Sequence, residues 1–342
     1  MKRKILVVVH EPTLTGAPLA ALRNASLILD SQLYDVDMAS WAVQGSKLQD
    51  EVLQKLGRNL LDINSINFEI YDLVICHSAA LMRTVVDFIK TGKKVLWWIH
   101  EDTHFFDVMG DARLLNLAFE RATGLIFTSA HCAYSTFGHW VWKRNAKNVF
   151  VIPNCPDFTG DSTSYKDRSL FRVVHVAYLG IEKGTDRVLA VAKALEDHSD
   201  IDFTLVGRVR STFENQMSDL PKNCKYLGEK SRDQTIDIMR QSHLLFHPTR
   251  LDNQPLVIVE AAQMGLDIIS TFLPSVANYL DGLNGLKWLP DTEDELSIAI
   301  ATSLILDIHD SMDSKSGDIG LPIQMSSEYQ RYMTVLAIGE CV

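Results

Sequence analysis

Short runs of strand-forming residues alternate with helical stretches from one end of the chain to the other. Such alternation is typical of parallel sheets covered by helices. The runs predicted as strands in the first half are 4–10, 35–41, 71–78, 94–100, 124–129 and 149–154. Those in the second half are 172–180, 202–207, 224–228, 243–248 and 267–271. We therefore predict an α/β protein with two doubly wound, Rossmann-like domains.

Residues 156–169 separate the two series of strands. This segment is rich in Ser, Thr, Asp and Gly and poor in apolar residues, as expected of a linker. The length of 342 residues also exceeds what a single hydrophobic core usually supports. We predict a first domain at 1–156, a second domain at 170–325, and a C-terminal helix at 326–342 that could return to the first domain.

Charge and cysteine usage narrow the class of protein. The net charge of −10 disfavours nucleic acid as a partner, because its phosphates select strongly basic surfaces. The five cysteines are widely scattered without a CxxC pair, so neither a disulfide framework nor a cysteine-based zinc site is indicated. No apolar stretch has the length of a signal peptide or a membrane span. These observations predict a cytoplasmic protein.

The segment 137–148 interleaves aromatic and basic residues in a half of the chain that is otherwise nearly neutral. This combination suits an anionic membrane surface, which favours peripheral contact with the inner face of the membrane. A solvated loop between a helix and a strand is the alternative interpretation.

His100, Glu101 and His104 have the HExxH spacing of zinc peptidases. That signature holds zinc only on a helix, where residues four apart share a face. His100 instead ends the run 94–100, whose bulky residues predict a buried parallel strand. We therefore predict no metal site, and a histidine at the carboxyl end of a strand, where open α/β sheets bind ligands. A structural histidine is the alternative.

The stretch 246–265 leads from a predicted strand through polar residues into a nearly all-apolar helix. Its one charged helical residue is Glu260, and burial of a carboxylate is costly without a partner. Ribose or hexose hydroxyls would be suitable partners, and an arginine or a backbone amide is the alternative. At the start of the helix, backbone N–H groups of Gln254, Leu256 and Val257 favour an anion such as a diphosphate.

Asp252 and Glu260 enclose seven residues, a spacing that resembles the paired glutamates of retaining nucleotide-sugar glycosyltransferases with the GT-B fold. The family is glycosyltransferase family 4, or glycosyl transferases group 1. The resemblance covers nearly the whole chain, through the segments TGAP at 15–18, KVLWWIH, FTSAHC, VFVIPN, AYLGIEKGTDRVL at 177–189, LVG at 205–207 and the tail EYQRYMTVL. It implies two Rossmann-like domains that face a central cleft, with the acceptor domain first and the donor domain second.

The resemblance also implies roles for individual residues. Glu260 would bind the ribose of the donor, and Asp252 would lie beside the transferred sugar, although it is one methylene shorter than the family glutamate. Lys183 would neutralise donor phosphate, which gains negative charge as the glycosidic bond breaks. The arginine that usually accompanies this lysine is absent, because Tyr178 occupies its position.

Arg208 and Arg250 are the candidates to replace that arginine. The loop at 15–18 resembles the backbone that approaches the donor phosphates, where small residues allow close contact. Glu101 would face the acceptor or cap a helix. The candidate set is therefore His100, Asp252 and Glu260 for catalysis, Gly16, Ala17, Lys183, Arg208, Arg250, Asn253, Gln254, Leu256 and Val257 for the donor, and Glu101 for the acceptor.

The resemblance implies a hexosyltransferase-type enzyme that moves a sugar from a nucleotide diphosphate sugar to a hydroxyl with retained configuration, in polysaccharide or glycoconjugate biosynthesis. It needs no metal and no cofactor, and its partners are the donor and a sugar, lipid-linked or polysaccharide acceptor. A nucleotide-sugar epimerase or a phosphorylase on the same fold is an alternative. Another is a catalytically degenerate subunit that only binds the nucleotide sugar, as Tyr178 and Asp252 suggest.

Overall fold

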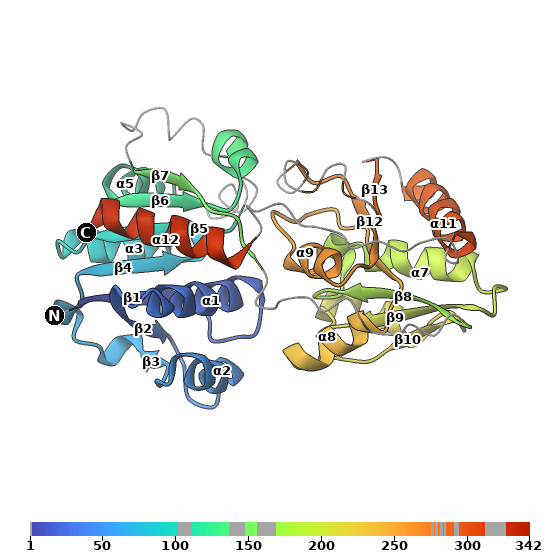
Figure 1. Cartoon of the computed structure of the whole chain (residues 1–342), viewed down its shortest axis with the longest axis horizontal. Helices are drawn as coiled ribbons and strands as arrows, with labels where there is room; N and C mark the ends of the chain where they lie inside the picture. Colours follow the sequence, from blue (N-terminus) through green and yellow to red (C-terminus); the bar gives the residue numbers. More distant parts are fainter. Residues whose placement is uncertain are drawn as a thin grey trace. The chain divides into compact units, whose positions relative to one another are not determined.

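The chain divides into two units, each with its own parallel sheet (Figure 1). The first unit comprises Met1–Asp157 and Ile323–Val342, and the second comprises Phe158–Pro322. The computed structural model describes residues 2–101, 111–136, 148–155, 169–274, 277, 280, 283, 285–290, 294–311 and 326–342. All but the last residue of the predicted linker and of the aromatic and basic segment 137–148 lie outside the described residues.

The first unit contains a seven-stranded sheet in the order β3-β2-β1-β4-β5-β6-β7, with every neighbouring pair parallel. Its strands are β1 (Arg3–Val9), β2 (Tyr34–Ser40), β3 (Leu61–Asp62), β4 (Leu73–His77), β5 (Val95–Ile99), β6 (Gly124–Phe127) and β7 (Val149–Val151). The α-helices described in this unit are α1 (Gly16–Asp30), α2 (Lys47–Leu56), α3 (Met82–Lys90), α5 (Ala112–Arg121) and α12 (Ser327–Cys341).

The last helix, α12, packs beside α1 of the first unit (Figure 1). Its residues Ala337 and Ile338 are fully buried in the apolar core that α1 and β1 also form. Buried Gln330 donates a hydrogen bond to Asn24 Oδ1 of α1 at 2.8 Å. The end of the chain is therefore held by apolar packing and by a polar contact that is sealed from water.

The second unit contains a six-stranded sheet in the order β10-β9-β8-β11-β12-β13, again with parallel neighbours. Its strands are β8 (Phe171–Val176), β9 (Ile201–Val206), β10 (Cys224–Tyr226), β11 (Leu244–His247), β12 (Asp267–Thr271) and β13 (Leu286–Leu289). The α-helices described in this unit are α7 (Thr185–Ala194), α8 (Arg232–Arg240), α9 (Leu256–Gln263) and α11 (Asp294–Asp310).

The predicted fold class, two doubly wound Rossmann-like domains, is confirmed, and each predicted strand is present. The central strands are buried on both faces, so they appear in the sequence as continuous apolar runs. Strands β3 and β13 were missed. Both are short and only partly buried, so neither produces an apolar run that can be recognised.

The strand order reverses between β1 and β4 in the first sheet, and between β8 and β11 in the second. Open α/β sheets bind ligands at the carboxyl ends of the strands that flank such a reversal. Most of the candidate residues follow one of these four strands. The topology of each sheet therefore accounts for where its candidate residues lie.

Two properties of the described residues concern the environment of the protein. No helix among them combines the length and the apolar composition that crossing a lipid bilayer requires. All five cysteines are buried, and none of them forms a disulfide. Burial raises the pKa of the Cys76 thiol beyond its usual range and that of Cys224 to about 12, so these thiols are poor nucleophiles.

Candidate functional site

Lys183 and Asp252 meet at the carboxyl edge of the second sheet. Lys183 lies in the loop after β8 and Asp252 in the loop after β11, and these two strands are neighbours. The Nζ atom of Lys183 lies 2.6 Å from Asp252 Oδ2 and donates a second hydrogen bond of 3.0 Å to the carbonyl oxygen of Leu251. The side chains are 24% and 16% exposed, so this ion pair is largely shielded from water.

Two basic side chains act on the Asp252 carboxylate. Burial alone would raise the pKa of Asp252, but the positive charge of Lys183, with His247 beside it, outweighs burial and lowers the pKa to about 2. The Nε2 atom of His247, which is 2% exposed, lies 3.5 Å from the same Oδ2 atom. Asp252 is therefore a carboxylate at neutral pH, directed toward the protein's own cation.

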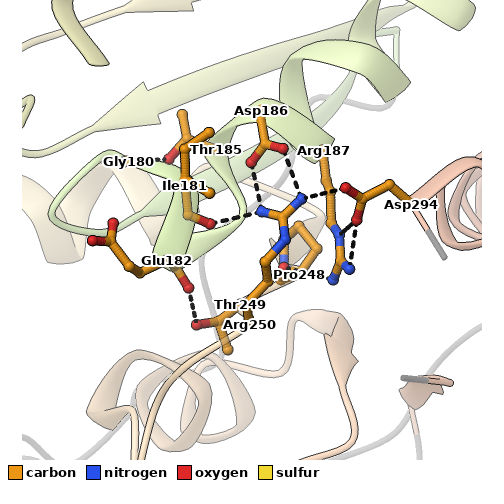
Figure 2. A network of polar contacts seen from close by, with 10 residues as sticks. All are labelled: Gly180, Ile181, Glu182, Thr185, Asp186, Arg187, Pro248, Thr249, Arg250 and Asp294. Carbon is orange, nitrogen blue, oxygen red and sulfur yellow. Dashed lines mark hydrogen bonds and ion pairs between the residues drawn. The ribbon is translucent and has the colours of Figure 1, made fainter. Parts of the chain in front are cut away.

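Arg250, in the loop after β11, belongs to a network of charged side chains (Figure 2). Its guanidinium donates to both oxygens of Asp186 at 2.8 and 2.7 Å, to Asp294 Oδ2 at 2.9 Å and to the carbonyl oxygen of Ile181 at 2.7 Å. Arg187, which is 5% exposed, pairs with the other oxygen of Asp294 at 2.7 Å. The predicted role of Arg250 as a cation for donor phosphate is therefore not supported, because two carboxylates of the protein already engage its guanidinium.

The network joins the loop after β11 to the loop after β8 (Figure 2). The Thr249 hydroxyl and the Arg250 backbone N–H donate to the carbonyl oxygen of Glu182 at 3.0 and 2.9 Å. Gly184 has a φ of +69°, and a Cβ atom there would lie 2.0 Å from the carbonyl oxygen of Pro248. Only glycine permits this close approach. The fold thereby fixes the backbone on both sides of Lys183.

Glu260 is 3% exposed in α9 and forms an ion pair with Arg232, the first residue of α8. Arg232 Nη2 lies 2.6 Å from Glu260 Oε1. The alternative considered from the sequence, a pair with an arginine, is therefore present. The pairing explains how a carboxylate is tolerated within an otherwise apolar helix. Sequence analysis missed Arg232, because nothing near it in the chain marks it as a partner of Glu260.

No side-chain cap at the start of α9 is found among the described residues. Pro255 takes the position before the helix, with extended backbone. Leu256 and Val257 form the first turn, and Asn253 and buried Gln254 directly precede it. The leading N–H groups of an α-helix have no intrahelical acceptors, and its dipole favours an anion there. The start of α9, which follows β11 in the chain, is therefore suited to binding phosphate.

Tyr178 is 40% exposed, and Arg210 from the neighbouring loop after β9 covers its ring. The guanidinium carbon lies 4.6 Å from the ring centroid, and Arg210 Nε lies 3.3 Å from Glu182 Oε2. Such stacking on an aromatic face is a favourable cation–π geometry. Arg208 is exposed, and its side chain makes no hydrogen bond or ion pair with the part of the chain that the structure describes. The sequence pointed to Arg208 and Arg250 and missed Arg210.

In the first unit, His100 directly follows β5, as predicted. Its Nε2 atom lies 3.0 Å from Nδ1 of His77, the last residue of the neighbouring strand β4. His77 is fully buried and stacks on Trp98 with ring centroids 4.8 Å apart. Burial, reinforced by His10, lowers the pKa of His100 to about 3. Sequence analysis missed His77 because it is the polar end of an apolar strand.

The Glu101 carboxylate accepts hydrogen bonds from the Ser78 hydroxyl, from the Ala79 N–H at 2.7 Å and from the His100 N–H at 3.0 Å. Ser78 and Ala79 begin a 3₁₀ turn after β4. Glu101 therefore has the capping role that the sequence left open, with both oxygens engaged. His104, the last member of the HExxH spacing, lies outside the described residues.

Gly16 and Ala17 form the first turn of α1, immediately after the loop that follows β1. A Cβ atom on Gly16 would meet no described atom within 4 Å. The protein's own packing thus does not require glycine here. Space for a bound group is one reason that a chain retains so small a residue at such a place.

Comparisons with known proteins agree with this arrangement. Residues 163–307 match the family described as Glycosyl transferases group 1, and residues 1–152 match Glycosyl-transferase family 4. The chain is 27% identical to the gpi3 subunit of phosphatidylinositol N-acetylglucosaminyltransferase from Schizosaccharomyces pombe, over 69% of this chain. The match covers 52% of that subunit, so the chain spans about half the length of this relative.

Two solved structures share the fold over nearly their full length. Anabaena HepE in complex with UDP and glucose matches with a TM-score of 0.74 and 17% identity, covering 99% of this chain and 98% of HepE. A mutant of S. aureus TarM, in complex with Fondaparinux, alpha-GlcNAc-glycerol and UDP, matches with a TM-score of 0.71 and 10% identity, covering 99% and 98%. The two family matches together cover most of the chain, and the resemblance inferred from its motifs is confirmed. The chain belongs to the GT-B glycosyltransferases of family 4, glycosyl transferases group 1.

Proposed function

We propose that the chain transfers a sugar from a nucleotide diphosphate sugar to a hydroxyl group with retained anomeric configuration. The observation that carries this proposal is the position of Lys183 beside Asp252, at the carboxyl ends of β8 and β11, where the uncapped start of α9 also lies. A lysine and a helix start together favour a diphosphate. Lys183 is 24% exposed, so a ligand can reach its ammonium group.

The proposed reaction begins with the diphosphate close to Lys183 and the first turn of α9. As the bond from the anomeric carbon to the phosphate oxygen breaks, that oxygen gains negative charge, which Lys183 and the α9 amides stabilise. The acceptor oxygen bonds to the same face of the sugar, and its proton passes to the departing phosphate oxygen. The positive field comes from the protein, so the mechanism uses no metal and no cofactor.

Asp252 has a further effect in this mechanism. In the protein without donor its carboxylate neutralises Lys183 at 2.6 Å. A diphosphate must therefore share Lys183 with Asp252. The competition lowers affinity but leaves a carboxylate beside the reacting sugar, which is where the family resemblance puts this residue.

Arg210 is a better candidate than Arg250 for a second cation that, with Lys183, binds the donor phosphates. It stacks on Tyr178, the residue at the position of the family arginine, and it belongs to a loop that contacts the loop carrying Lys183. Arg250 is engaged by Asp186 and Asp294. We propose that Arg210 supplies the positive charge that Tyr178 lacks.

In the first unit, the candidate residues under this proposal are His100, Gly16 and Ala17. Because its pKa is lowered to about 3, His100 is uncharged at neutral pH and acts as a hydrogen-bonding group rather than as a cation. A neutral imidazole suits a sugar hydroxyl. The start of α1 provides backbone N–H groups and open space next to Gly16 for phosphate.

The acceptor that we propose is a glycoconjugate or polysaccharide precursor, reached at the inner face of the membrane. The relative from Schizosaccharomyces pombe is named for transfer to phosphatidylinositol, which supports a lipid-linked acceptor. The aromatic and basic residues of 137–148 suit contact with anionic lipid. The UDP complexes of HepE and TarM make UDP the first nucleotide to test.

The proposal is tested by calorimetry with UDP and GDP, followed by incubation with the matching nucleotide sugars and NMR of the products. We expect binding of one nucleotide, slow donor hydrolysis without acceptor, and a product with the donor's anomeric configuration. Lys183→Ala should weaken both binding and turnover. An inverted product, an epimerised donor without acceptor, or sugar release that depends on orthophosphate would each refute retaining transfer.

A binding subunit without turnover is the second candidate function. It is favoured by Tyr178 in place of an arginine and by Asp252, whose carboxylate faces Lys183. Nucleotide binding without hydrolysis or transfer under all donor and acceptor conditions would establish it.

A further inference from the structure

The ion pair between Arg232 and Glu260 joins two residues that are each poorly placed for the stability of their own helix. Glu260 lies among the buried apolar residues of α9, where a carboxylate costs free energy. Arg232 is the first residue of α8, at the positive end of the helix dipole, which disfavours a cation. The two unfavourably placed residues pair with each other, with Arg232 Nη2 2.6 Å from Glu260 Oε1.

The start of α8 does not need Arg232. Ser231 caps the helix, and Gln234 completes a reciprocal capping box with it, while Asp233 already complements the dipole. A buried ion pair is also a weak source of stability, since an apolar pair of similar size often serves as well. A locally unfavourable residue that stability does not explain indicates a functional constraint.

The two oxygens of Glu260 differ. Oε1 is buried and faces Arg232 at 2.6 Å as an ion pair, without a hydrogen bond to any described residue. Arg232 is 31% exposed in its side chain and Glu260 only 4%, so the arginine reaches the carboxylate from the open side. The ion pair thus engages Oε1 and leaves Oε2 outside it.

We propose that Arg232 is a positioning residue for nucleoside recognition: it holds Glu260 by Oε1 so that Oε2 accepts hydrogen bonds from the ribose hydroxyls of the donor. The inference rests on the proposed function, because it requires that Glu260 binds the ribose. It adds the residue that orients and stabilises that carboxylate. Arg232 then acts through Glu260 and makes no ligand contact of its own.

The test compares the binding of UDP and 2′,3′-dideoxy-UDP by calorimetry. The proteins are wild type, Arg232→Met, Arg232→Lys, Glu260→Gln and the double variant Arg232→Met with Glu260→Gln. Arg240→Met, at the other end of α8, is the matched control. We expect wild type to prefer UDP by about tenfold or more, the effect of one hydrogen bond to a charged group. Arg232→Met and Glu260→Gln should each remove most of this preference.

The double variant identifies how Arg232 acts. If Arg232 works through Glu260, the double variant loses no more preference than Glu260→Gln alone, and Arg232→Lys restores part of it. Losses that add would show that Arg232 contacts the ligand itself, and an unchanged ratio in Arg232→Met would show that it has no part in ribose recognition. Either result overturns the inference while the proposed function stands.

Folding is monitored by thermal unfolding of every variant. If Arg232→Met leaves Glu260 too destabilising to fold, the double variant, which has neither charge, and Arg232→Lys still decide the question. Wild-type protein that binds neither nucleotide would reject the proposed function and the inference together. Wild-type protein that binds both equally would reject only the inference and its ribose contact.

Discussion

The Nδ1 atom of His77 lies 3.0 Å from the Nε2 atom of His100, so the imidazoles at the ends of β4 and β5 share one hydrogen bond. A hydrogen bond between two imidazoles needs one nitrogen with a proton and one without. Burial holds the pKa of His77 well below its usual range, with the neighbouring His100 adding to the effect. Burial likewise lowers the pKa of His100, and that of His175 in the second unit, to about 3.

We predict that these histidines make the protein acid-sensitive at unusually mild pH. The unfolded chain binds protons below a pH of about 6.5, whereas the folded protein does not, so stability falls as pH drops below that value. Each such histidine contributes a loss of up to about 2 kcal/mol between pH 6.5 and 5. Above pH 6.5 these histidines have little effect on how the free energy of unfolding depends on pH.

Urea unfolding midpoints at pH 7.5, 6.5, 5.5 and 5.0 test this prediction. His77→Phe retains an aromatic ring to stack on Trp98 but takes up no proton, so its midpoint should depend less on pH. Equal midpoints at pH 7.5 and 5.0 in wild type would show that the three histidines do not oppose protonation.

The ion pair of Lys183 and Asp252 leads to a prediction of opposite effects on UDP binding. Lys183→Ala removes the phosphate cation and should weaken binding about tenfold or more. Asp252→Asn removes the internal competitor for Lys183 and should strengthen UDP binding severalfold while lowering sugar transfer. Lys193→Ala, at a lysine 68% exposed on α7 and paired with nearby Glu196, is the control. Weaker UDP binding by Asp252→Asn would contradict the proposed competition.

The same pair predicts a change that NMR can follow directly. In wild type the Asp252 carboxyl should titrate near pH 2, because Lys183 and His247 outweigh the effect of burial. The folded pKa is depressed, so the pair's contribution to stability is complete above the unfolded pKa and is lost as pH falls from that value through the folded pKa of about 2. Its size is on the order of 2 kcal/mol. In Lys183→Ala the pKa should rise above its usual range, since burial then prevails.

Arg210 and Arg208 provide a matched pair of substitutions in one loop. Arg210 stacks on Tyr178, whereas the side chain of Arg208 has no polar partner in the described regions of the chain. We predict that Arg210→Ala weakens UDP binding by roughly tenfold and that Arg208→Ala changes it little. Uridine, which lacks phosphate, should bind both variants as it binds wild type. The reverse ranking would make Arg208 the phosphate cation.

The fold and the edges of both sheets were predictable because they depend on local patterns. A buried parallel strand is an apolar run, and α9 stands out because Glu260 is its one charged residue. The partners of the candidate residues were not predictable. Arg232 and His77 approach Glu260 and His100 only after strands distant in the chain pair, and nothing in their own neighbourhoods indicates it.

Arg250 shows that the charges that surround a candidate residue also depend on the fold. Sequence analysis named Arg250, together with Arg208, as a candidate to replace the family arginine whose position Tyr178 occupies. The structure pairs it with Asp186 and Asp294, which come from α7 and α11. A cation near a site cannot be assigned to a ligand until the carboxylates that fold against it are known. Asp252 itself, next to an unanticipated His247, illustrates the same dependence on tertiary contacts.

The last prediction contrasts two glycines that look alike in the sequence. At Gly184 the φ of +69° and the overlap with Pro248 leave no room for a side chain, so Gly184→Ala should destabilise the protein. We expect a loss of about 2 kcal/mol or more, because the loops around Lys183 must shift.

At Gly16 the space is open, and alanine favours a helix more than glycine does. Gly16→Ala should therefore leave thermal stability unchanged or higher while weakening UDP binding, if the space beside α1 receives phosphate. Thermal unfolding and calorimetry on both variants separate the two roles, and unimpaired UDP binding by Gly16→Ala would remove the α1 loop from the donor site.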